Sequence, residues 1–153
     1  SPCPKCGYDD RITPIATFAF LIERDPPSLN KRLSNTLVAG RKYRRERETW
    51  MLEMRAARLA YKLPMAVRDK TDRSSWPVVP GKRRVTIARM FGGRQRERDL
   101  DNLIGGAKPV IDAMVHERLL ADDAAGAAEI HYRQCRLAFD GRAGLYITLE
   151  VLP

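Results

Sequence analysis

The stretch that decides the fold of this chain reads Arg94-Gln-Arg-Glu-Arg-Asp-Leu-Asp-Asn-Leu-Ile-Gly-Gly-Ala-Lys-Pro-Val-Ile-Asp-Ala-Met114, and Asp122-Asp123 follow it. Asp99 and Asp101 are one residue apart, so in an extended segment their side chains would leave the same face of a strand. Neighbouring carboxylates repel one another, and a hard divalent cation such as Mg²⁺ relieves that repulsion by binding carboxylate oxygens. The pattern therefore indicates a candidate Mg²⁺ site.

Beyond this acidic pair the pattern changes to that of a helix. Gly105-Gly106 allows a sharp turn, and Pro109 suits a first helical turn. An apolar stripe then recurs at helical spacing, through Val110, Ile111, Met114, Val115 and Leu119. We expect the helix to end near Leu120, so that Asp122 and Asp123 return to the first acidic pair.

These motifs resemble the signature of the RusA-type Holliday-junction resolvases, the endodeoxyribonuclease RusA family. That signature has an Asp-x-Asp-Asn start, a Lys at the head of a helix, an Asp-Ala-Leu-like turn and a distal Asp-Asp. Here its parts read Asp99-Leu100-Asp101-Asn102, Lys108, Asp112-Ala113-Met114 and Asp122-Asp123. Pro26-Pro27-Ser28-Leu29-Asn30 also looks like the loop after the family's first strand, and the resemblance extends over roughly residues 17–151.

The spacing departs from the family pattern at one place. In the familiar form the Lys follows Asp-Asn after a shorter gap, and Gly105 occupies that offset here. Lys108 has the correct spacing when it is counted backward from Asp112. We therefore interpret Ile104-Gly105-Gly106 as a turn with three extra residues, and Lys108 as the equivalent of the family's Lys.

The resemblance implies a Mg²⁺-dependent structure-specific endodeoxyribonuclease that resolves four-way DNA junctions by paired symmetric cuts in recombination and repair. Asp99, Asp101 and Asp123 would hold one or two Mg²⁺ ions, with Asp122 as a supporting ligand and Mn²⁺ as a substitute metal. Lys108 would neutralise the charge that grows on the phosphate. Two symmetric cuts need two sites, so a homodimer is expected.

Taken singly, the acidic motifs favour a structural role. Asp and Asn cap helices and shape turns by bonding nearby backbone N–H groups, and Asp112 can pair with Lys108 one helical turn earlier. We interpret His116 as a surface residue of the helix and His131 as a residue of a strand. Neither histidine is interpreted as a metal ligand. The balance shifts because both acidic motifs occur together, with one helix between them and a run of arginines beside them.

The charge of the chain indicates a polyanionic partner. Its formal net charge of +9 favours nucleic acid over a membrane surface, although a basic surface can also serve solubility alone. The candidate DNA contacts are the clustered residues Arg44, Arg45, Lys82, Arg83, Arg84, Arg94, Arg96 and Arg98. The alternatives to junction resolution are cleavage of other branched DNA and non-catalytic DNA binding.

Residues 1–14 are expected to form an N-terminal extension ahead of a RusA-like nuclease domain at 15–153. Cys3-Pro-Lys-Cys6 has the spacing of a zinc knuckle, but a complete structural Zn²⁺ site needs four ligands. The other candidates, Cys135, His116 and His131, belong to elements with other roles. A half-site completed by a second chain, a remnant, a truncated site and a solvent-exposed pair all stay open.

Cysteine usage and hydropathy bear on the compartment. Three cysteines do not make a disulfide framework. No apolar run suggests a membrane span or a signal peptide. We expect a cytoplasmic protein without a membrane partner, and the resemblance implies a bacterial or phage origin.

Hydrophobic patterning predicts the remaining elements. Strands are expected at 15–23 and 83–91, a helix at 44–63, and a hairpin formed by 129–139 and 145–151. In the helix the core stripe is Trp50, Met54, Ala57 and Tyr61. The order β-α-β-α-β-β indicates a single α+β domain, with two main helices covering one face of a mixed sheet of about four strands.

Overall fold

The computed structural model describes residues 12–26, 36–67, 79–124, 126–138 and 143–153, with 36–39 described by their backbone only. Its elements are β1 (Ala16–Ile22), α2 (Thr36–Tyr61), β2 (Arg83–Phe91), α3 (Leu100–His116), β3 (Ala128–Arg136) and β4 (Gly144–Val151). This order confirms the predicted α+β domain. The Cys3/Cys6 pair and 27–30 of the expected family loop lie outside the described residues.

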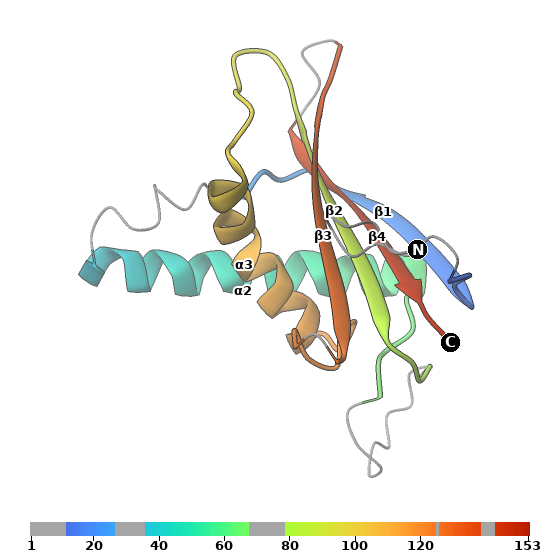
Figure 1. Ribbon diagram of the computed structural model, residues 1–153. Coiled ribbons are helices and arrows are strands. Elements are labelled where there is room, and N and C mark those ends of the chain that lie inside the picture. Colours follow the sequence, from blue (N-terminus) through green and yellow to red (C-terminus); the bar gives the residue numbers. More distant parts are fainter. Residues whose placement is uncertain (1–11, 27–35, 68–78, 125, 139–142) are drawn as a thin grey trace.

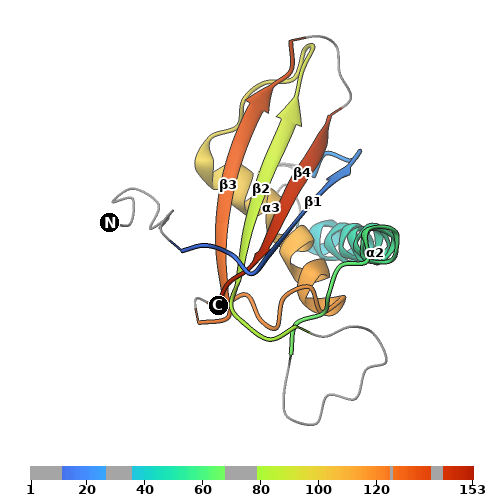
Figure 2. The same cartoon turned by 90° about the vertical axis from the view of Figure 1, so that its right-hand side faces the viewer.

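The four strands form one mixed sheet in the order β1-β4-β2-β3. β4 is antiparallel to both of its neighbours, whereas β2 and β3 are parallel. Parallel strands need a crossover connection, and α3 provides it. Both helices lie on the same side of the sheet (Figures 1 and 2), as the sequence predicts.

The predicted hairpin of the last two strands is wrong, because β2 lies between them. Val85 pairs with Ile130 of β3 on one side and with Leu149 of β4 on the other. β2 is buried along nearly its whole length, as expected for a central strand that has a hydrogen-bonded neighbour on each side. Alternation along β4 reports one buried face but does not identify the neighbouring strand.

The core lies between the sheet and the two helices. Phe20 of β1, Val85 and Ile87 of β2 and Ile147 of β4 are at most 2% exposed. From α2, Trp50, Met54 and Ala57 pack against them, as predicted. The fourth residue of that stripe, Tyr61, is half exposed and tilts its ring against Phe20, with 5.8 Å between centroids.

Helix α2 begins at Thr36, eight residues before the predicted start at Arg44. Once the stripe around Trp50 is docked, each further residue adds one hydrogen bond at little cost, because helix propagation is easier than nucleation. The far end of α2 is tied to α3 by Glu117, which is 4% exposed and pairs with Arg55 at 3.0 Å and Arg58 at 3.2 Å. No helix in the described ranges is long and apolar enough to cross a membrane.

Helix α3 runs through Gly105, Gly106 and Pro109, so the predicted Gly-Gly turn is wrong. Intrinsic propensity opposes this, because each interior Gly costs about 1 kcal/mol and Pro about 3 kcal/mol relative to Ala. Burial of the apolar face opposes that cost, at about 1.5–3 kcal/mol for each large side chain. The buried stripe begins about two turns earlier than we expected, and comprises Leu103, Ala107, Val110, Ile111 and Met114.

Candidate acidic site on helix α3

The first acidic pair lies at the N-terminus of α3 and not on a strand. Asp99 is the N-cap, with φ −62° and ψ 162°. One of its oxygens accepts the backbone N–H of Asn102 at 2.8 Å, and the other accepts the Asn102 side-chain amide at 2.7 Å. The backbone bond, followed by the side-chain bond, holds the pKa of Asp99 below its usual value. Asp101 is exposed in the first turn, where the helix dipole favours negative charge.

The two carboxylates therefore do not share a strand face, and that expectation is corrected. The capping preference of Asp decides the local structure, because its carboxylate satisfies an N–H group that the helix itself leaves unpaired.

Lys108 joins α3 to the distal acidic pair. Its Nζ lies 2.9 Å from Oδ1 of Asp112 and 3.5 Å from Oδ2 of Asp123. The hydroxyl of Tyr43, on α2, donates to the second oxygen of Asp112. The hydrogen bond from Lys108 to Asp112 is the main cause that raises the pKa of Lys108. The predicted pairing of Lys108 with Asp112 is thus confirmed, and the structure also brings Lys108 to Asp123.

Two tyrosines in this neighbourhood were missed by sequence reasoning. Tyr43 lies within the basic cluster of α2, and Tyr132 is a half-buried residue of β3 packed against the core. Burial raises the pKa of Tyr132, while the charge of Lys108 lowers it and that of Asp123 raises it. Neither tyrosine belongs to a motif. The alternation of Ile130, Tyr132 and Gln134 along β3 was the available signal for an inward-facing phenol.

The two ends of the site are separated along α3. Asp101 and Lys108 are seven residues apart, so they share a face two turns apart, with a rise of about 10 Å between them. Asp122 accepts the backbone N–H of Asp123 at 2.7 Å, and both side chains are exposed. Within the described ranges, no three Asp, Glu, His or Cys side chains are grouped to hold a metal ion.

Carboxylate oxygens are the donors that Mg²⁺ prefers, so the residue types suit the expected metal. Their arrangement does not, because Asp99 and Asp101 lie at the N-terminal end of α3 while Asp123 is paired with Lys108. Asp99, Asp101, Asp122 and Asp123 do not fit a single coordination group as they are placed.

Four of the candidate DNA contacts are exposed: Arg44, Arg45, Arg94 and Arg96. Arg83 and Arg84 are buried, and we correct their assignment. Arg83 donates to the carbonyls of Pro64, Met65 and Val79. Burial lowers the pKa of Arg83 to about 10, so it remains charged at neutral pH.

Arg84 lies at the centre of an ion-pair cluster across three strands. It contacts Glu129 of β3 at 2.9 Å and Glu150 of β4 at 3.8 Å. Lys82 reaches the same Glu129 at 3.4 Å and is more than one third exposed. Arg84 is therefore a structural residue, whereas Lys82 keeps part of its surface open to a ligand.

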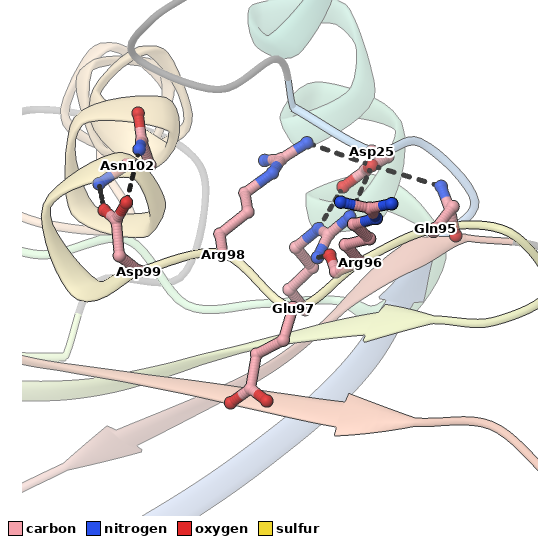
Figure 3. A pocket seen from close by; sticks show the side chains of 8 residues that line it. Asp25, Gln95, Arg96, Glu97, Arg98, Asp99 and Asn102 are labelled. Atoms are coloured by element: carbon pink, nitrogen blue, oxygen red, sulfur yellow. Dashed lines mark hydrogen bonds and ion pairs between the residues drawn. The ribbon is translucent and has the colours of Figure 1, made fainter.

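Arg98 is also engaged within the protein. It donates to the carbonyl of Pro26 at 2.6 Å and pairs with Asp25 at 3.1 Å. Burial, opposed by the charge of Asp25, lowers the pKa of Arg98. Arg98 belongs to the wall of a pocket of about 420 Å³ that extends from Asp25 to Asp99 and Asn102. Figure 3 shows Arg98 between these two ends and Glu97 pointing away from Asp25.

A comparison with protein-family models and a comparison with curated protein sequences each gave no match.

Proposed function

We propose that this protein is a structure-specific endodeoxyribonuclease that cleaves branched DNA, with the four-way junction as its substrate. Mg²⁺ is the cofactor that the RusA resemblance implies, although the aspartates are not grouped around one metal position as they are placed here. The observation that carries the proposal is the contact of Lys108 with Asp123 at 3.5 Å. It brings the distal Asp-Asp of the RusA-like pattern to the helix whose first turn holds Asp99 and Asp101. Lys108 and Asp123 are each about half exposed, so a DNA phosphate has access to both.

Lys108 is the residue suited to the phosphate. Its ammonium is held by Asp112, which is held in turn by Tyr43, and a preoriented cation costs little reorganisation when charge develops. A raised pKa keeps Lys108 protonated at neutral pH. In the proposed reaction Lys108 binds a non-bridging phosphate oxygen and stabilises the negative charge that grows as the phosphodiester is hydrolysed.

Affinity for the DNA backbone would come from the exposed arginines. Arg94 and Arg96 precede the N-terminus of α3, and Arg44 and Arg45 lie on α2. Contacts of this kind are independent of sequence and weaken steeply with salt. The proposal also includes a homodimer, because one chain carries one acidic site while paired cuts need two.

A second candidate function is non-catalytic DNA binding by the same basic surface. One specific observation favours it: both carboxylate oxygens of Asp99 are used by Asn102 to cap α3. On this account Asp99 is structural, and the pair formed by Lys108 and Asp123 only fastens the chain after α3 to the helix.

The two candidates separate in one assay. Protein is incubated with a labelled four-way junction with and without Mg²⁺, and forks, flaps and duplex are compared at equal salt. The nuclease predicts paired nicks that depend on Mg²⁺ and disappear in Asp123→Asn, with junction binding retained. Binding without nicks, in Mg²⁺ and also in Mn²⁺, would establish the second candidate. Faster cleavage of flaps or forks than of junctions would change the substrate but keep the nuclease.

A further inference from the structure

The segment that leads into α3, residues 92–99, has no helix or strand of its own. We name it the α3 entry segment. Part of its shape is internal, since Gln95 bonds to both the N–H and the carbonyl of Gly92. Further contacts come from Arg89 on β2 and Gln134 on β3, and from Asp25 in the chain after β1. Because Asp99 is its last residue, whatever holds this segment also places the proposed acidic site.

Asp25 lies at the centre of those contacts (Figure 3). One oxygen accepts Nε of Arg89 at 2.8 Å, and the other accepts Arg89 at 3.2 Å and Arg98 at 3.1 Å. Gln95 donates to the same carboxylate at 3.4 Å. The Arg89 side chain is only 3% exposed, so Asp25 supplies the counter-charge that a buried guanidinium requires.

Arg89, which Asp25 holds in place, contacts the α3 entry segment directly. Its NH1 donates to the carbonyl of Arg96 at 3.0 Å and to the side-chain oxygen of Gln134 at 3.2 Å. Gln134, on β3, in turn holds the backbone of Arg98 on both sides. It accepts the Arg98 N–H at 2.9 Å and donates to the Arg98 carbonyl at 2.7 Å. The residue after Arg98 is the N-cap of α3.

From this chain of contacts we infer that Asp25 is a positioning residue: through Arg89, Arg98 and Gln134 it sets where Asp99 and the first turn of α3 stand. The inference deepens the proposed function and rests on it where cleavage is measured. Asp25 does not itself serve as a ligand, because two arginines occupy its carboxylate. The same contacts explain why Arg98, within a run of basic residues, is turned inward.

The test begins with Asp25→Asn, which removes the counter-charge at little steric cost. The first readout is hydrogen exchange at the amide of Asn102, which bonds to Asp99 and is not touched by Asp25. We expect protection to fall by about tenfold or more, since opening of the entry segment exposes the cap. In cleavage assays kcat should fall roughly 10–100-fold with KM changed less than about threefold, because the reacting groups are misplaced while the DNA surface remains.

Glu53→Gln is the matched control. Glu53, on α2, pairs with Arg24 at 3.5 Å, so this variant also breaks an ion pair beside Asp25 but leaves the network around Arg89 intact. It should keep wild-type exchange at Asn102 and wild-type kcat. Equal loss of protection in Glu53→Gln would overturn the inference, because any change near the end of β1 would then have the same effect.

The double variant Asp25→Leu/Arg89→Met separates positioning from stability. Replacing a buried ion pair by apolar side chains commonly restores stability, but it does not restore the bonds to Arg96, Arg98 and Gln134. We expect the unfolding free energy to recover while protection at Asn102 and kcat stay low. Recovery of all three together would overturn the positioning role.

Gln134→Leu covers the case in which Asp25→Asn fails to fold. It removes both bonds to the Arg98 backbone and leaves the ion pairs in place, so it should also lower protection at Asn102. Wild-type protection in this variant would overturn the inference. If the wild-type protein cleaves no branched DNA in Mg²⁺ or Mn²⁺, the proposed function fails, and exchange at Asn102 still decides whether Asp25 positions Asp99.

Discussion

Arg84 and Glu129 are directly opposite partners on the parallel strands β2 and β3, and their side chains form an ion pair at 2.9 Å. Arg84 is almost fully buried, and Glu129 is one quarter exposed. Burial alone would raise the pKa of Glu129, but the hydrogen bond and charge of Arg84, together with Lys82, hold it below its usual value. The pair fastens β3, an edge strand, to the centre of the sheet.

This pair predicts a pH dependence of stability. A carboxyl group whose pKa is lowered by folding stabilises the protein above its unfolded pKa, and that contribution is lost as pH falls through the folded value. Glu129→Gln should therefore destabilise the protein by about 1–2 kcal/mol at pH 7. The difference from wild type should shrink at pH values below 4.5. Urea unfolding of both proteins across this range measures it, and a difference independent of pH would contradict the assignment.

Asp99 offers a substitution pair that separates capping from catalysis. Asn is as good an N-cap as Asp, so Asp99→Asn should keep wild-type thermal stability while it removes a negative oxygen. Cleavage should fall by orders of magnitude with junction affinity retained or increased, because repulsion of DNA phosphates is reduced. Asp99→Ala should lose stability as well. Near-normal cleavage by Asp99→Asn would show that Asp99 serves only as the N-cap of α3. Near-normal cleavage by Asp101→Asn would refute the proposed catalytic function.

Lys108→Ala tests the assignment of the catalytic cation. Loss of one preorganised charge that acts on the transition state costs about 2.7–4 kcal/mol, so kcat should fall roughly a hundred- to a thousandfold. Lys42→Ala, at an exposed position of α2, is the control and should leave kcat unchanged. Wild-type turnover in Lys108→Ala would refute the role of Lys108 without deciding the role of the aspartates.

The salt dependence of DNA binding tests which of the exposed arginines contact the phosphate backbone. Arg94→Ala and Arg96→Ala should each reduce the slope of log affinity against log salt by about one, as expected for a lost phosphate contact. Arg133→Ala is the control, since Arg133 is exposed on β3 and alternation directs it to the face of the sheet opposite α2 and α3. Equal slopes of log affinity against log salt for all three variants would show that the DNA does not bind at Arg94 and Arg96.

Assembly is measured by light scattering. The homodimer predicts a mass near twice 17.4 kDa, and the two sites of an isologous dimer are related by a two-fold axis, which suits symmetric cuts. A monomer at micromolar concentration that still makes paired cuts in a four-way junction would exclude the dimer as the active form.

The sequence by itself determined the order of the helices and strands and the approximate place of each in the chain. The stripe of Trp50, Met54 and Ala57 and the alternation along β4 both report a buried face, because side-chain direction repeats with the local backbone geometry. The same local spacing predicted the pair of Lys108 with Asp112, four residues apart on one helix. These features depend on neighbours within one or two turns, so they can be read without the fold.

Only the tertiary structure decided what depends on segments far apart in the chain. The position of β2 between β3 and β4, the inward turn of Arg83 and Arg84, and the contacts of Asp25 with Arg89 and Arg98 all join distant residues. The course of α3 through Gly105-Gly106 and Pro109 was decided in the same way. Local propensity opposes that helix, and its apolar face is stabilised only when the sheet and α2 are present to bury it.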